Sequence, residues 1–216
     1  DRWMQVGADE LSQLIQQFQT EVQAEDQEAQ RLRNVNQRWA RMVGTDRLTG
    51  LPNKTSFIEA LAPREIQQAS RNDDAVGFVL LSADNLGVIN EQHGRNAGDE
   101  VIQGLAQFLQ SITLGEEVLG HLDGTNFALM FYPATLDHAM ARAEDLRTAV
   151  AAHSIPCSGT LIQITISAGA YSVDSASVDD ARAGAENVFS ILNEALYRAK
   201  QAGGDRTEAA NESPTV

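Results

Sequence analysis

Two acidic residues beside turns are the ones in this sequence that could hold a metal ion next to a phosphate. Asp123 precedes Gly124 in the stretch HLDGTNFALMF (residues 121–131), and Asp84 follows the apolar run VGFVLLS (76–82). Phosphoryl transfer on a nucleotide substrate needs several carboxylates that hold divalent cations against the phosphates. Two isolated acids are fewer carboxylates than such a reaction needs.

The stretch around Asp123 also has the pattern of a β-hairpin. An Asp-Gly pair is favoured in two-residue hairpin turns because the central residues must tolerate positive φ. We therefore predict strands near 116–122 and 126–132 that pair across Asp123-Gly124. The second of these strands is nearly all apolar, which is typical of a buried strand.

The rest of the chain after Gly44 alternates helical and extended patterns. Periodicity and turn residues predict further strands at 76–82 and 160–173, the latter alternating polar and apolar residues. They predict helices at about 54–70 (disturbed at Pro63), 86–93, 97–112, 136–153 and 178–202, the last ended by Gly203-Gly204. The polar segment 208–216 is predicted to be a disordered tail.

The N-terminal residues 1–43 have a different pattern. From Leu11 to Val43, ten positions spaced alternately by four and three residues carry eight apolar side chains. This heptad repeat predicts a long coiled-coil helix and a homodimer through residues 11–43, with Asn36 fixing the register. The alternative is a single amphipathic helix that packs on the following domain.

Charge and composition exclude several kinds of partner. The 216 residues carry a net charge of −14 and hold one cysteine, Cys157. Such a chain is a poor ligand for a nucleic acid polymer or an anionic membrane, whereas one lysine and a bound cation suffice for a small nucleotide. A single cysteine fits a reducing compartment, so we expect a cytoplasmic domain.

The sequence starts at Asp1 without a signal-peptide pattern, and no apolar run approaches 18 residues. We interpret it as a piece of a longer protein. The segment GADELSQLIQQF (7–18) resembles the end of a HAMP signalling helix, which would suit a membrane-tethered sensor upstream.

Five segments in order resemble the GGDEF, or diguanylate cyclase, domain. The resemblance runs from about Thr45 to Arg206, so we place the domain at 44–207. It is carried by TDRLTGLPNKTSF, LLSADNLGVINEQHGRNAGDEVI, HLDGTNFALMF, ISAGAYSV and LNEALYRAKQAGGDR. The resemblance implies an α+β fold with a central, largely antiparallel sheet flanked by helices. It also implies a reaction in which two facing domains condense two GTP molecules into cyclic di-GMP.

The metal-binding acids of the family are missing here. By resemblance, the first-strand metal position falls on Ser82. The GGDEF motif falls on Asp123, Gly124, Thr125, Asn126 and Phe127. Thr125 and Asn126 thus replace both motif acids, so we predict no catalytic residue, and Asp84 and Asp123 are the remaining metal candidates. We favour a turn role for Asp123 and a structural or solvated role for Asp84, for example capping the next helix.

The family's nucleotide-binding positions are better retained. The resemblance assigns guanine recognition to Asn90 and Asp99, and phosphate binding to Lys200. Local hydrogen bonding by Asn90 and helix capping by Asp99 are the alternatives. No cofactor is expected, and Mg²⁺ only if a nucleoside triphosphate binds. The four histidines, His121 among them, are predicted to be surface or loop residues.

These observations favour a catalytically inactive GGDEF domain that acts as a regulatory module in bacterial cyclic di-GMP signalling. It would sense GTP or cyclic di-GMP and respond to a partner protein or an upstream sensor domain. An active diguanylate cyclase with an unusual metal site is the alternative. A pure protein-interaction module that binds no ligand is a second alternative.

Overall fold

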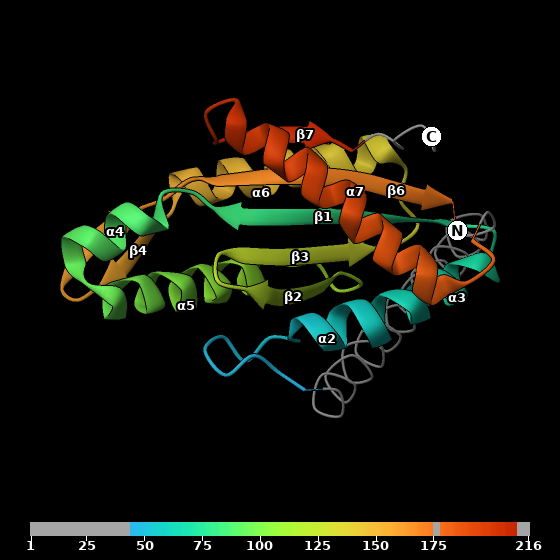
Figure 1. Cartoon of the computed structure of the whole chain (residues 1–216), viewed down its shortest axis with the longest axis horizontal. Helices are drawn as coiled ribbons and strands as arrows, with labels where there is room; N and C mark the ends of the chain where they lie inside the picture. Colours follow the sequence, from blue (N-terminus) through green and yellow to red (C-terminus); the bar gives the residue numbers. More distant parts are fainter. Residues whose placement is uncertain (1–43, 175–177, 211–216) are drawn as a thin grey trace, which may run out of the picture. The chain divides into compact units, whose positions relative to one another are not determined.

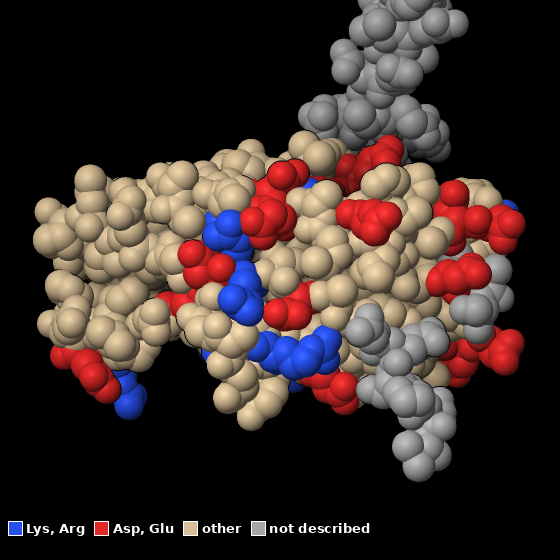
Figure 2. Space-filling view, turned by 90° about the horizontal axis from the view of Figure 1, so that it is seen from above, with Lys and Arg blue, Asp and Glu red and all other residues tan. Residues whose placement is uncertain are grey.

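The computed structural model describes residues 44–174 and 178–210. The predicted N-terminal coiled coil lies outside these residues. Within the described part of the chain, no helix combines the length and the hydrophobicity that crossing a membrane requires. Figure 2 shows one face of the molecule, where acidic side chains are spread widely and most of the basic side chains lie close together near the middle.

A five-stranded sheet runs through the domain in the order β2-β3-β1-β6-β7 (Figure 1). Its strands are β1 (Ala75–Ala83), β2 (Val118–Asp123), β3 (Asn126–Phe131), β6 (Ile166–Asp174) and β7 (Thr207–Ala209). β1 pairs antiparallel with β3 and β6, β2 pairs antiparallel with β3, and β7 runs parallel to β6. The predicted α+β fold with a largely antiparallel central sheet is confirmed.

Helices cover both faces of this sheet. One face packs against α5 (Arg95–Ile112) and α6 (Leu136–Ala152). The other packs against α7 (Ala181–Gln201) and against the continuous helical segment α2 (Lys54–Ser56), η1 (Phe57–Leu61, π-helical) and α3 (Ala62–Ser70). The short helix α4 (Leu86–His93) packs against α5 at the end of the sheet.

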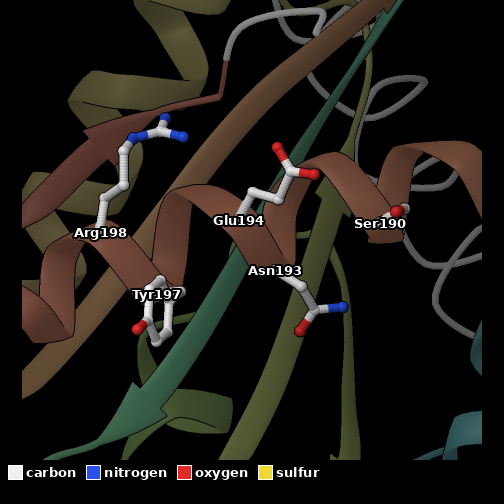
Figure 3. Close-up of a pocket in the computed structure, with 5 residues that line it drawn as sticks. All are labelled: Ser190, Asn193, Glu194, Tyr197 and Arg198. Carbon is white, nitrogen blue, oxygen red and sulfur yellow. The ribbon is translucent and has the colours of Figure 1, made fainter.

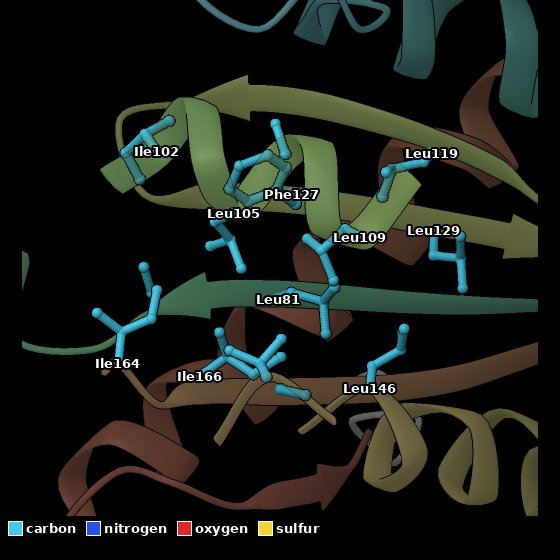
Figure 4. Close-up of a cluster of buried hydrophobic side chains, with 14 of the residues drawn as sticks. Leu81, Ile102, Leu105, Leu109, Leu119, Phe127, Leu129, Leu146, Ile164 and Ile166 are labelled. Atoms are coloured by element: carbon cyan, nitrogen blue, oxygen red, sulfur yellow. The ribbon is translucent and has the colours of Figure 1, made fainter. Parts of the chain in front are cut away.

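The central strand β1 is buried on both faces, which its unbroken apolar sequence predicts. Val79 and Leu81 belong to the core beneath α5 and α6, whereas Phe78 and Leu80 belong to the core beneath α7. Figure 4 shows the first core, where Leu81 lies near Leu105 of α5. Because side chains alternate along a strand, Ser82 must point toward α7.

Two of the long helices, α6 and α7, begin at side-chain caps. The Thr135 side chain accepts a hydrogen bond from the His138 backbone at the start of α6, and Asp180 accepts from two backbone amides at the start of α7. Such caps satisfy amides that have no partner inside the helix. α7 ends before Gly203 and Gly204, which both have positive φ, as the Gly-Gly pair predicts.

Three local predictions were wrong. Residues 160–173 form two strands, because β5 (Thr160–Gln163) pairs with β4 (Ser154–Cys157) in a separate hairpin before β6 begins. The hairpin turn is shifted by one residue: Asp123 pairs with Asn126, so Gly124 and Thr125 form the turn. Residues 208–210 continue the sheet through β7, and Ala210 is buried, so they are not part of a disordered tail.

Candidate functional site

The end of β1 lies beside the turn of the hairpin that β2 and β3 form, at one end of the sheet. Ser82 is directly opposite Asn126 in the pairing of β1 with β3. The backbone amide of Ala83 also donates to the carbonyl oxygen of Thr125. The sheet therefore brings together the three positions that the resemblance assigns to metal-binding acids, namely Ser82, Thr125 and Asn126.

Lys200 reaches this point from the last turns of α7. Its Nζ donates to Ser82 Oγ over 2.6 Å, and Ser82 Oγ lies 2.9 Å from Thr125 Oγ1. Ser82 is completely buried. The family's phosphate-binding lysine position and its first-strand metal position are thus joined by a hydrogen bond.

Asp84 is held on the opposite side of β1 from the hairpin. Its carboxylate accepts from Thr165 Oγ1 at 2.9 Å, from Ser167 Oγ at 2.7 Å and from the Asp205 amide at 3.0 Å. The side chain is almost fully buried. The predicted capping role is wrong, since α4 has Asn85 at its N-cap position and no side-chain cap. Asp84 instead ties β1 to β6 and to the loop after α7.

Asp123 shares none of its polar partners in the described part of the chain with Asp84. Its carboxylate accepts from Asn126 Nδ2 at 2.6 Å and lies 3.6 Å from Lys54 Nζ, with half of the side chain exposed. The described residues contain no group of three or more His, Cys, Asp or Glu side chains that could hold a metal ion. At the three metal positions of the family and at Lys200 the side chains carry two hydroxyls, one amide and an ammonium group. These groups do not fit Mg²⁺, a cation that prefers carboxylate and water oxygens.

The predicted base-binding residues lie on two helices that pack together, Asn90 on α4 and Asp99 on α5. The Asn90 side chain lies against Gly98, where a Cβ atom would overlap its Oδ1. This buried Oδ1 finds no hydrogen-bond partner among the described residues. Asp99 follows Gly98 and is exposed in the second turn of α5, which begins at Arg95, so it does not cap that helix.

A buried histidine, His121, joins the hairpin to the loop before α2, so the prediction of a surface position is wrong for this histidine. His121 on β2 is 4% exposed and stacks at a tilt on Phe127. Its Nε2 lies 3.2 Å from the Gly124 carbonyl oxygen, and its Nδ1 lies 2.9 Å from Asp46 Oδ1. The second contact is short, but its geometry is not that of a well-directed hydrogen bond.

The partner of this histidine, Asp46, organises the loop Thr45–Asn53. Its Oδ1 accepts from the Leu48 and Thr49 amides and from the Thr49 hydroxyl. Burial raises the pKa of the Asp46 carboxyl, but the contacts with His121 and Thr49 outweigh burial and keep this pKa below its ordinary value. The carboxylate is therefore the favoured form.

Sequence reasoning missed Thr165, Ser167 and His121. The two hydroxyl residues fit the alternation of polar and apolar residues in 160–173, so that pattern holds no signal that they bind Asp84. Such groups are buried only where they find partners, and here the partner of both is Asp84.

A shallow depression of about 530 Å³ lies along the outer side of α7 (Figure 3). It is lined by Ser190, Asn193, Glu194, Tyr197 and Arg198. Tyr197 is 64% exposed and precedes Lys200 by less than one helical turn. The depression is therefore a neighbour of the hairpin site and does not include its polar network.

Comparisons with known proteins agree with this geometry. DgcP, a diguanylate cyclase of Pseudomonas aeruginosa, is 29% identical over 201 residues, which cover 93% of this chain and 29% of that protein. DgcM, a diguanylate cyclase of Escherichia coli K12, is 33% identical over 166 residues, which cover 76% of this chain and 38% of that protein. The chain thus spans well under half the length of these curated relatives.

The fold is similar to that of the GGDEF domain of DgcB from Caulobacter crescentus, solved in complex with c-di-GMP. The TM-score is 0.68 at 22% sequence identity, covering 77% of this chain and 95% of that one. The family described as "Diguanylate cyclase, GGDEF domain" matches residues 43–206. With three quarters of its length matched, this chain belongs to the GGDEF diguanylate cyclase family.

Proposed function

We propose that this domain binds a guanine nucleotide, GTP or cyclic di-GMP, without converting it, and acts as a regulatory module in cyclic di-GMP signalling. The observation that carries the proposal is the buried Asn90 Oδ1 without a partner. A buried acceptor left unpaired costs about 1–3 kcal/mol. Guanine carries N–H donors that would satisfy it, with the exposed Asp99 carboxylate close by in sequence.

Loss of catalysis is proposed from the hairpin. A cyclase must hold cations against the triphosphate and favour deprotonation of a 3′-hydroxyl. At the family's acidic positions this chain has Ser82, Thr125 and Asn126, and Asp84 is already engaged by three donors. None of these groups is left to act as a base or a metal ligand.

The regulatory role would depend on residues 1–43. We propose that this segment forms the homodimeric coiled coil of a cytoplasmic domain and connects it to an upstream sensor or partner protein. His121 supports a path for such coupling, since it contacts both the loop after this segment, through Asp46, and the hairpin, through Gly124.

Calorimetric titration with GTP, GDP and cyclic di-GMP tests nucleotide binding. We expect saturable binding of at least one of them, weakened about tenfold or more by Asn90→Ala and by Asp99→Ala. Asp137→Ala, which changes an exposed acid at the start of α6, is the matched control for Asp99 and should bind as the wild type does. Absence of binding by all three nucleotides would favour an interaction module without a ligand.

A second assay tests catalysis. The protein is incubated with GTP and Mg²⁺ or Mn²⁺, and cyclic di-GMP is sought by chromatography. We expect no product above the background of a protein-free sample. Robust turnover that Asp84→Asn abolishes in a protein shown to be folded would instead establish an active cyclase with an unusual metal site.

A further inference from the structure

The hydrogen bonds at the hairpin have a defined direction. Lys200 can only donate, so Ser82 Oγ is the acceptor of their 2.6 Å bond. Ser82 is fully buried, and its Oγ makes one other side-chain hydrogen bond in the described part of the chain, with Thr125 Oγ1. Its proton is satisfied only if it is donated to Thr125. The Thr125 hydroxyl proton is then free to be donated outward.

With the hydrogen bonds in this direction, the family's metal positions present hydrogen-bond donors. Lys200 has two further N–H groups, and Thr125 has its hydroxyl proton. The lone pair with which Ser82 would face a cation is occupied by an ammonium group. A divalent cation placed here would be repelled by Lys200, and the carboxylates of Asp84 and Asp123 are already engaged by other groups. An anion would instead meet the N–H and O–H donors of Lys200 and Thr125.

We propose that this end of the site binds a phosphate group of the guanine nucleotide directly and without a divalent cation. The Lys200 ammonium supplies the positive charge at the place where the family's metal positions fall, and Thr125 supplies a neutral donor. The inference rests on the proposed nucleotide binding and specifies its form. Lysine is a common phosphate ligand that acts as a point charge, which suits this arrangement.

The chain offers a matched control, because Lys54 and Lys200 are its only lysines. Lys54 is exposed on the other side of the hairpin, 3.6 Å from Asp123. Replacing either lysine by methionine removes the same charge and leaves a side chain of similar length. Lys200→Arg keeps the charge with a different donor geometry.

The test is a calorimetric titration of GDP into the protein, once in EDTA and once in excess MgCl₂. We expect the two dissociation constants to agree within about twofold. Lys200→Met should weaken binding about tenfold in both buffers, Lys200→Arg should retain most of the affinity, and Lys54→Met should bind like the wild type. Thermal unfolding of each variant shows that it is folded.

The outcomes separate this inference from the proposed function. Binding that Mg²⁺ strengthens more than tenfold, or that Lys200→Met leaves unchanged, would overturn the metal-free phosphate site while nucleotide binding stands. Absence of GDP, GTP and cyclic di-GMP binding in either buffer would overturn the proposed function itself, and this inference with it.

Discussion

The two ends of the candidate site differ in how their polar groups are satisfied. At the base end, between α4 and α5, the buried Asn90 Oδ1 has no partner among the described residues. At the hairpin end, Ser82, Thr125 and Lys200 bind one another, and Asp84 is held by its own three donors. One end has a buried acceptor without a partner among these residues, whereas at the other end the protein's own side chains bind one another.

The difference teaches that loss of catalytic acids need not leave a hole in a fold. A buried polar group must be hydrogen-bonded or it destabilises the folded state. Hydroxyl groups and a lysine meet that requirement at the hairpin without a metal ion. The unpaired oxygen of Asn90 does not meet it among the described residues, which is why we propose a ligand there.

The largest effect should come from Asp84, which we place in the structure rather than in catalysis. Asp84→Ala leaves the Thr165 and Ser167 hydroxyls and the Asp205 amide without their acceptor, so the free energy of unfolding should fall by about 3 kcal/mol. Urea denaturation measures this. The control Asp123→Ala, at an exposed acid, should cost less than about 0.5 kcal/mol. Equal effects would remove the distinction between these two acids.

The base end can be disturbed by a substitution that replaces no polar side chain. A Cβ atom at Gly98 would overlap Asn90 Oδ1, so Gly98→Ala should push that side chain aside and weaken nucleotide binding about tenfold. Gly87→Ala on α4 is the matched control, because its Cβ would meet nothing within 4 Å. Calorimetry with GTP compares them. Unchanged affinity in Gly98→Ala would contradict a role for Asn90.

At the hairpin end, acids can be introduced at the family's three metal positions. The triple variant Ser82→Asp, Thr125→Asp, Asn126→Glu places carboxylates at the three metal positions of the family. We expect Mg²⁺ to strengthen GTP binding by about tenfold in this variant and to have little effect in the wild type. The single variant Asn126→Glu controls for added charge. If Mg²⁺ strengthened GTP binding by the wild type as much as by the triple variant, the proposed difference between the two ends would be wrong.

The smallest effect concerns the support of the hairpin by Asp46. Its pKa in the folded protein lies below the ordinary value, so its stabilisation is present above the unfolded-state pKa and is lost as the pH falls through the folded-state pKa. Asp46→Asn should therefore lower the free energy of unfolding by about 1 kcal/mol at pH 7. That difference should shrink as the pH falls below about 4, as followed by urea denaturation. A difference that stays constant with pH would refute this account of Asp46.

Much of the fold could be predicted from local signals. The apolar run of β1, the Gly-Gly end of α7 and the Thr135 start of α6 each have a strong physical cause in a few adjacent residues. The single strand predicted at 160–173 failed because alternation continues across the break between β5 and β6. The extent of the tail failed because β7 is a short, polar strand that is stabilised by pairing with β6.

The site could be predicted less well, because its contacts join residues far apart in the chain. The resemblance selected Ser82, Thr125 and Lys200, but it did not predict that they bind one another across 43 and 118 residues. The partners of Asp84 on β6 were likewise invisible to local patterns. His121 was misjudged because its burial depends on Asp46 and Phe127, which lie on other elements.

The most direct test of the account is a GTP titration of the wild type and of Asn90→Ala under identical conditions in EDTA, where no cyclase chemistry can proceed. We predict saturable binding by the wild type and at least tenfold weaker binding by the variant. Equal affinities, or no binding by the wild type in either EDTA or Mg²⁺, would contradict the claim that this domain has kept a guanine-binding end while losing its catalytic one.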